Sequence, residues 1–230
     1  FAELIREVGY QTACIGKWDV SNRKPIIPRM PNAQGFDYYF GIPYSNDMDS
    51  DQWGKYLKEA EDPDYFSKTE FFNVPLIENS QVIERPADQT TITKRYTQKA
   101  VQFIEQNKEQ PFFLYLAHSM PHIPLFVSEE FRGRSKASLY VDVIEEIDWS
   151  VGEVLKTLEK NQLDQNTIVV FTSDNVPWLL FKTHGGSAGP LRAGKGTTFE
   201  GGQRVPTVFW GPGIVKSGVI NQMGATLDLL

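Results

Sequence analysis

Residues 167–175 read Thr-Ile-Val-Val-Phe-Thr-Ser-Asp-Asn, an apolar, β-branched run that ends in a carboxylate and a carboxamide. This pattern predicts a buried strand that delivers Asp174 and Asn175 to the edge of a sheet, where open α/β folds bind their ligands. About twenty residues later, segment 194–202 reads Gly-Lys-Gly-Thr-Thr-Phe-Glu-Gly-Gly and carries Lys195 on a flexible loop. Two hard oxygen donors beside a fixed cation indicate a site for a tetrahedral oxyanion.

The rest of the chain alternates between strand and helix patterns. The spacing of apolar residues predicts the end of a helix at 1–8, strands at 10–16, 111–117 and 205–210, a hairpin at 74–84, and helices at 89–107 and 136–160. Strands that alternate with helices favour an α/β fold with a mostly parallel central sheet and helices on both faces.

Several of these segments carry finer predictions. The continuous apolar run 111–117 is typical of a central strand that is buried on both faces. Asp88 is placed to cap the helix that follows it. In the helix at 136–160, Glu145, Glu146 and Glu153 fall on the face predicted to meet water.

Two long stretches have no regular pattern. Segment 17–66 is rich in Pro, Gly, Asn and Asp, and it is predicted to be mainly loop. Segment 174–204 is much longer than an ordinary connection and is rich in Gly, which is typical of a binding loop.

Size and composition narrow the class of protein. The chain has 230 residues, of which 40% are hydrophobic, and a formal charge of −6. These values suit one α/β domain or most of one. The sequence has no basic patch, so a nucleic-acid partner is not expected. No apolar run reaches the roughly 20 residues that are needed to span a membrane. The single cysteine, Cys14, excludes an internal disulfide and is expected to be a small buried thiol.

Polar residues collect where three predicted strands end. Lys17 and Asp19 follow the first strand, His118 and His122 follow the second, and Asp174 and Asn175 follow the third. The carboxyl ends of parallel strands share one edge of a sheet, so these side chains are expected to converge.

Each of these residues also has a structural interpretation. Lys17 can be a solvated surface lysine, and His118 and His122 can be hydrogen-bonded structural histidines. The acid–amide pair can cap a turn or a helix. The third histidine, His184, lies beside two glycines and can be part of a plain loop.

Segment 189–196 nearly matches the phosphate-loop pattern G-x-x-x-x-G-K-[ST]. Gly196 stands where that pattern needs a hydroxyl, and no strand directly precedes the loop. The segment is therefore not interpreted as a nucleoside-triphosphate site.

Taken together, the motifs resemble those of the type I sulfatases, particularly arylsulfatase A-like enzymes. The resemblance covers essentially the whole chain and is carried by Gly9-Tyr10, Thr12, and segments 16–18, 35–37, 41–45, 121–124, 173–175 and 194–202. Segments 173–175 and 194–202, in this order and spacing, are the most specific.

The resemblance implies an alkaline-phosphatase-like fold and hydrolysis of a sulfate ester by a formylglycine residue with bound Ca²⁺ (or Mg²⁺). Asp174 and Asn175 match two of the family's metal ligands, and oxygen donors suit such a hard cation. Lys17 and Lys195 match lysines that contact the sulfate. His122 matches a histidine beside the leaving group, which is a candidate general acid.

Parts of the family pattern are missing from the chain. The C/S-x-P-x-R nucleophile motif, the acidic metal ligands of the first strand and the C-terminal subdomain are all missing. Since the motif and those ligands normally lie upstream, residues 1–230 are expected to be the central part of one catalytic domain, truncated at both ends and inactive alone. By resemblance, the full-length protein is expected to need a formylglycine-generating enzyme, and to be periplasmic, extracellular or lysosomal.

Three substitutions depart from the family at the site. Asp19 replaces a histidine that assists formylglycine chemistry, and a carboxylate cannot act as an imidazole does near neutral pH. Val176 and Ala193 replace glycines, so the loops that hold them are expected to be strained if they need positive φ.

Three functions stay open at this point. The first is a sulfatase acting on a small-molecule or glycan sulfate ester. The second is a catalytically impaired homologue that binds sulfated ligands, as Asp19 suggests. The third is a phosphatase or phosphodiesterase with the same fold, which a different nucleophile would distinguish.

Overall fold

A computed structural model describes residues 1–21, 27–50, 52–62 and 65–229. Its strands are β1 (Gln11–Gly16), β2 (Tyr38–Gly41), β3 (Leu76–Glu78), β4 (Gln81–Glu84), β5 (Phe112–Ala117), β6 (Val169–Thr172) and β7 (Thr207–Trp210). Its α-helices are α1 (Ala2–Glu7), α2 (Trp53–Glu59), α3 (Ile92–Gln106), α4 (Leu139–Lys160) and α5 (Glu200–Gln203). Short 3-10 turns lie between several of these elements.

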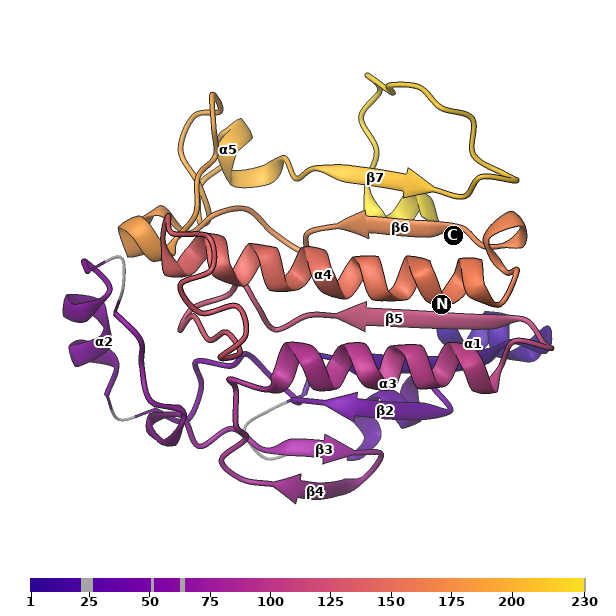
Figure 1. The fold of residues 1–230 in the computed structure, drawn as a ribbon, viewed down its shortest axis with the longest axis horizontal. Coiled ribbons are helices and arrows are strands. Elements are labelled where there is room, and N and C mark those ends of the chain that lie inside the picture. Colours follow the sequence, from indigo (N-terminus) through magenta and orange to yellow (C-terminus); the bar gives the residue numbers. More distant parts are fainter. Residues whose placement is uncertain (22–26, 51, 63–64, 230) are drawn as a thin grey trace.

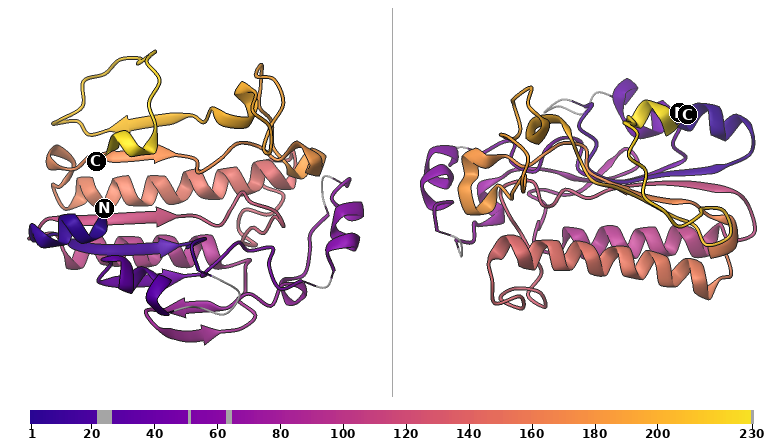
Figure 2. Two further views of the ribbon diagram at one scale, coloured as in Figure 1. Left: turned by 180° about the vertical axis from the view of Figure 1, so that it is seen from behind. Right: turned by 90° about the horizontal axis from the view of Figure 1, so that it is seen from above.

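The five strands β4-β3-β2-β1-β5 form the central sheet, in that order. Strand β1 runs parallel to both β2 and β5, while β3 and β4 add the antiparallel hairpin that the sequence predicted. Helices α3 and α4 lie side by side on one face of the sheet and α1 lies on the other, as Figure 1 and Figure 2 show. The predicted α/β fold class, with helices on both faces, is confirmed.

Strands β6 and β7 differ from the simplest reading of the sequence, because they pair antiparallel with each other and not with β5. Within the described chain, β5 is the last strand of the five-stranded sheet, and its Tyr115 is 44% exposed. The prediction of a central strand buried on both faces is therefore wrong for β5 in this structure.

The stretch predicted as mainly loop, 17–66, contains β2 and α2 as well as turns. Its residues 22–26, 51 and 63–64 lie outside the described part of the chain. Strand β2 was hard to predict because its four residues are too few to show a clear alternation.

The helix boundaries show where local sequence misleads. Helix α3 begins at Ile92 with Thr91 at its N-cap, and Asp88 instead accepts hydrogen bonds from the backbone and hydroxyl of Thr90. Asp88 therefore shapes the turn before the helix rather than capping the helix itself.

Helix α4 begins at Leu139, and the Ser138 side chain accepts a bond from the Val141 amide. Its apolar stripe packs inward as predicted, but Glu146 is 1% exposed and accepts a bond from the Ser128 amide. Glu146 thus does not face water, because the segment after β5 folds over that face of α4.

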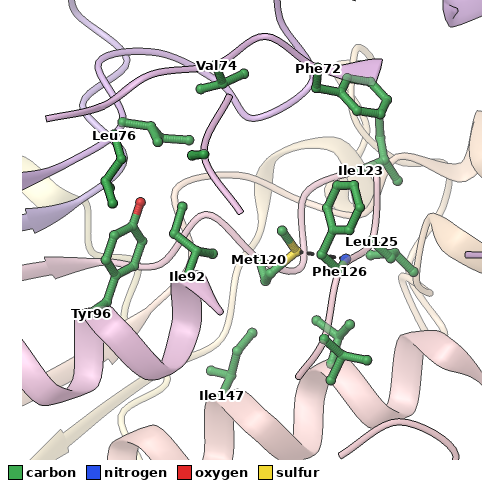
Figure 3. Close-up of a cluster of buried hydrophobic side chains, with 14 of the residues drawn as sticks. Phe72, Val74, Leu76, Ile92, Tyr96, Met120, Ile123, Leu125, Phe126 and Ile147 are labelled. Carbon is green, nitrogen blue, oxygen red and sulfur yellow. Dashed lines mark hydrogen bonds between the residues drawn. The ribbon is translucent and has the colours of Figure 1, made fainter. Parts of the chain in front are cut away.

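The hydrophobic core lies between the sheet and helices α3 and α4, and it extends into the segment that follows β5 (Figure 3). In that segment Met120, Ile123 and Leu125 are all almost completely buried. Because these apolar side chains anchor the segment on both sides of His122, the core fixes the backbone that carries this histidine.

Candidate functional site

Close approach of two strand ends, those of β1 and β5, positions Lys17. Gly16, which ends β1, has a φ of +121°, and a Cβ there would lie 1.8 Å from the carbonyl oxygen of Ala117 at the end of β5. Only glycine fits such a contact. The next amide, of Lys17, donates to that same carbonyl at 2.7 Å. Lys17 is thereby held at the carboxyl edge of the sheet.

Lys17 contacts Asp174, the acidic residue that follows β6. Its Nζ lies 3.1 Å from Oδ2 of Asp174, and the Lys17 side chain is 12% exposed whereas that of Asp174 is 59% exposed. Although burial alone would raise the pKa of Asp174, the charges of Lys17, Lys195 and His122 lower it. Asp174 is therefore ionised and accessible from solvent, as a metal-ligating carboxylate has to be.

Lys195 approaches from the long loop. Its amide donates to the Pro177 carbonyl at 2.8 Å, which ties the loop to the segment after β6. Its Nζ lies 4.8 Å from the ring centroid of Trp178, and the His122 ring lies 6.0 Å from the same indole. Trp178 therefore contacts both the ammonium of Lys195 and the imidazole of His122.

His122 is held through one ring nitrogen. Its Nδ1 lies 2.7 Å from the Ile123 carbonyl oxygen, 3.1 Å from Oδ1 of Asn46 and 3.4 Å from Oγ of Ser45. Burial lowers the pKa of His122, Asp47 partly opposes this, and the charges of Lys195 and Lys17 lower it further. The charges of Lys17, His122 and Lys195 all act on Asp174, so these four residues form one cluster. Lys17, His122 and Asp174 follow strands, and Lys195 joins them from the long loop.

Two predicted site residues have fewer contacts. Asn175 is exposed beside Asp174. The Ser173 hydroxyl donates to the backbone carbonyl of Asn175 at 2.7 Å, and the Asn175 carboxamide takes no part in this bond. Asp19 is exposed, two positions beyond Lys17. Their assigned roles stay predictions.

The two glycine replacements behave differently. Ala193 has a φ of +64°, so it occupies the left-handed conformation in which an alanine is strained, as the sequence suggested. Val176 is buried and is not among the described residues with positive φ. Strain is thus found at Ala193 and not at Val176.

The other two histidines are structural. His118 is partly buried, its Nε2 lies 3.1 Å from the Ser150 hydroxyl, and burial lowers its pKa to about 4. His184 is 1% exposed and contacts the Tyr56 hydroxyl and the Asp62 carbonyl. Neither histidine contacts the cluster through these bonds.

Metal-binding capacity is limited to part of a site. The described residues contain no group of three or more His, Cys, Asp or Glu side chains that could hold a metal ion. Asp174 and Asn175 offer two hard oxygen donors, whereas Ca²⁺ takes six to eight. The oxygen donors of these two residues are of the type that a hard cation binds, but two donors do not complete its coordination shell.

Sequence reasoning missed the residues that surround His122. Asn46 is completely buried, Asp47 is 9% exposed, and Oδ1 of Asp47 has no hydrogen-bond partner among the described residues. The sequence could have indicated these residues, because Asn46 and Asp47 directly follow the motif at 41–45. Trp178 gave no signal, since a single tryptophan in a loop is not distinctive.

None of the helices in the described residues has the length and hydrophobicity of a membrane-spanning segment.

Comparison with known proteins identifies a family. The sequence profile described as Sulfatase matches residues 1–230. The chain is 36% identical to N-acetylgalactosamine-6-sulfatase of Mus musculus, covering 99% of this chain and 42% of that protein. It is 34% identical to arylsulfatase A of Homo sapiens, covering 100% of this chain and 45% of that protein. The chain therefore spans less than half the length of these curated relatives.

Solved structures agree with the sequence comparison. The PsFucS1 sulfatase from Pseudoalteromonas sp. has a TM-score of 0.76 and 28% identity, covering 94% of this chain and 45% of that one. Ps i-CgsB in complex with k-i-k-neocarrahexaose has a TM-score of 0.71 and 32% identity, covering 92% of this chain and 47% of that one.

Proposed function

The chain belongs to the sulfatase family, and on that premise we propose that it forms the sulfate- and metal-binding part of an enzyme that hydrolyses sulfate monoesters. The observation that carries the proposal is the cluster of Lys17, Asp174, Lys195 and His122, which brings two cations, a carboxylate and an imidazole to one edge of the sheet. Residues 1–230 are proposed to be the central part of one catalytic domain.

The two lysines are suited to hold a sulfate group. A sulfate monoester carries its charge on three non-bridging oxygens, and ammonium groups that are already in place stabilise that charge without reorganising during the reaction. Lys17 is largely buried and fixed by Asp174, and Lys195 is held beside Trp178. Both are proposed to contact the substrate.

His122 is proposed to be the general acid. Departure of the alcohol leaves negative charge on the bridging oxygen, and a proton from an imidazolium neutralises it. The lowered pKa of His122 makes the imidazolium a stronger acid, and a bound sulfate would oppose the two lysines and help the ring keep its proton.

A divalent cation, Ca²⁺ or Mg²⁺, is proposed to bind at Asp174 and Asn175. The ionised carboxylate and the exposed carboxamide fit such a cation in kind, as described above. When bound, the cation would add positive charge beside the sulfate oxygens. Oδ2 of Asp174 also lies 3.1 Å from Nζ of Lys17, so the cation would share this carboxylate with the ammonium.

Formylglycine does not fit any residue of this chain. Cys14, the single cysteine, is completely buried in β1, and burial raises the pKa of its thiol. No C/S-x-P-x-R motif is present. The nucleophile is therefore proposed to come from an upstream segment modified by a formylglycine-generating enzyme, and the 230-residue chain alone is expected to be inactive.

The substrate is proposed to be a small-molecule or glycan sulfate ester. The names of two relatives, N-acetylgalactosamine-6-sulfatase and arylsulfatase A, support a sugar or an aryl sulfate. Membership of the family also supports a periplasmic, extracellular or lysosomal location.

The test uses the protein at its full natural length, co-expressed with a formylglycine-generating enzyme, once conversion is verified by mass spectrometry. Sulfate release from an aryl sulfate and from a 6-sulfated amino sugar is measured alongside release of phosphate from the matched phosphate esters. We expect turnover of a sulfate ester that Lys195→Ala reduces at least about 100-fold, while Lys216→Ala, at an exposed lysine, leaves it unchanged.

Absence of sulfate release after complete conversion rejects the proposal. Faster phosphate than sulfate release favours the phosphatase or phosphodiesterase alternative instead. The impaired-homologue alternative is favoured specifically by Asp19, which sits two residues from Lys17 where a carboxylate repels an anionic substrate.

A further inference from the structure

The amide of Asn46 has a fixed orientation. Its Nδ2 lies 3.1 Å from Oε1 of Gln89, 3.1 Å from the Pro124 carbonyl oxygen and 3.4 Å from the His122 carbonyl oxygen. Backbone carbonyls can only accept hydrogen bonds, so the NH₂ group has to occupy this position. Oδ1 of Asn46 is consequently the atom that faces His122.

Gln89 is fixed by the same reasoning. Its Nε2 donates to the backbone carbonyl of Asn46 at 3.0 Å, so its Oε1 has to be the atom that accepts from Asn46. Asn46 is 0% exposed and Gln89 is 1% exposed. We call these two residues the amide pair. Since burial of an unpaired amide is costly, neither amide is free to turn over.

The amide pair determines which nitrogen of His122 carries the proton. Nδ1 faces Oδ1 of Asn46 at 3.1 Å and the Ile123 carbonyl oxygen at 2.7 Å, and both oxygens can only accept. A neutral ring has one N–H, which therefore lies on Nδ1. Within the described chain no hydrogen bond involves Nε2, so that nitrogen is left for a ligand.

We propose that Asn46 and Gln89 are positioning residues that hold neutral His122 in the Nδ1–H tautomer and reserve Nε2 for the substrate. The catalytic meaning of this proposal rests on the proposed function, in which Nε2–H of the imidazolium donates its proton to the leaving oxygen. The proton moves from Nε2 to that oxygen, and the ring returns to the neutral Nδ1–H form that the amide pair stabilises. Tautomer and function are thus separately testable.

The arrangement explains why two amides are buried beside the apolar core. Met120, Ile123 and Leu125 surround this segment with side chains that offer almost no hydrogen bonds. An apolar pair in place of the amides would keep the packing but leave only the Ile123 carbonyl and the more distant Ser45 hydroxyl to orient the ring. The second acceptor removes the freedom of the imidazole to rotate about its Cβ–Cγ bond.

The first experiment is NMR on the protein labelled with ¹⁵N-histidine, which has three histidines. The spectrum is recorded well above pH 6.5, where burial and the lysine charges keep His122 neutral, and His122→Gln assigns its signals. We expect a pyrrole-type Nδ1 and a pyridine-type Nε2. We also expect Asn46→Leu to accelerate exchange of the Nδ1 proton with water about tenfold, the loss of one hydrogen bond.

Three variants keep the test decisive. Gln89→Met preserves side-chain length and releases Asn46, so it is expected to accelerate the same exchange if Asn46→Leu does not fold. Asn46→Asp keeps an acceptor facing Nδ1 and is expected to retain the Nδ1–H tautomer. Ser150→Ala removes the partner of His118 and is expected to change the His118 signals alone.

An Nε2–H tautomer in the unmodified protein overturns the proposal, as does unchanged Nδ1 exchange in the folded Asn46→Leu and Gln89→Met variants. In the active full-length enzyme, both variants are expected to lower kcat with little change in KM. If the NMR result holds but the enzyme shows no turnover, the proposed function fails while the tautomer assignment stands.

Discussion

Nζ of Lys17 lies 3.1 Å from Oδ2 of Asp174, although 157 positions separate the two residues in the sequence. The contact joins the end of β1 to the end of β6, two strands that belong to different sheets of the described chain. Asp174 is 59% exposed, so solvent screens the pair and its contribution to stability is small. Its importance lies in placing a carboxylate and an ammonium on the same side of the site.

Removal of that carboxylate is expected to abolish Ca²⁺ binding. If Asp174 and Asn175 bind Ca²⁺, saturating Ca²⁺ at about 100 times Kd raises the free energy of unfolding by about 2.7 kcal/mol. Asp174→Ala should lose this gain, measured as the Ca²⁺-induced change in Tm. Asp148→Ala, at an exposed acid on α4, serves as the control. Equal shifts in both variants would show that Asp174 is not a ligand.

The pH profile of turnover is expected to report His122. Its pKa lies below the ordinary 6.5, and a general acid has to hold its proton, so kcat/KM should fall as pH rises through this lowered pKa. His122→Gln should lower turnover by roughly 10²- to 10⁴-fold and remove the falling limb. A variant that keeps the same limb would assign the titration to another group.

Replacing Asp19 by histidine is expected to raise turnover. A carboxylate about 4 Å from a sulfate costs about 4 kcal/mol at an effective dielectric of about 20, so Asp19→His should accelerate the full-length enzyme by roughly ten- to a thousandfold. The measurement is the initial rate of aryl sulfate hydrolysis, with Asp148→His as the control for an added surface histidine. An unchanged rate would show that Asp19 does not limit turnover.

Glycine at position 193 is expected to stabilise the fold. Ala193 has a φ of +64°, a conformation that costs an L-residue roughly 1–2 kcal/mol and glycine very little. Ala193→Gly should therefore raise the free energy of unfolding by about 1 kcal/mol, after the greater flexibility of glycine in the unfolded chain is subtracted. Denaturant titration measures this value. Ala188→Gly, in the same loop but without a positive φ, should be neutral or destabilising.

Neutralising Glu146 is expected to stabilise the protein near neutral pH. Burial raises the pKa of this carboxyl above 4.5, so the wild type loses stability as pH rises from 4.5 through the folded-state pKa. Glu146→Gln lacks this loss and should gain about 1 kcal/mol at neutral pH, since one oxygen of Glu146 has no partner among the described residues.

The pH dependence of that gain is the discriminating readout. The advantage of Glu146→Gln should vanish below pH 4.5, where the wild-type carboxyl is protonated in both folded and unfolded states. Glu145→Gln, at a partly exposed carboxyl that pairs with Arg134, is the matched control and should show no gain. A constant difference at all pH values would point to packing instead of ionisation.

Local sequence was sufficient where one interaction dominates. The apolar periodicity of α4 and the alternation across the β3–β4 hairpin gave the right elements, because burial of one face outweighs other local preferences. Prediction from local sequence failed for Asp88 and Glu146. Their side chains accept hydrogen bonds from backbone amides, and a pattern along the chain does not reveal these contacts.

For the site, the pattern of residues was enough to identify Lys17, His122 and Asp174 after strands and Lys195 on the glycine-rich loop, because a carboxylate, two ammonium groups and an imidazole at such positions are recognisable chemistry. Tertiary structure alone decided how they interact. It set the Lys17–Asp174 contact, the contact of Lys195 with the Trp178 ring, and the buried amide pair of Asn46 and Gln89. The physical reason is that hydrogen bonds and charges act over a few ångströms in space, and these neighbours are far apart along the chain.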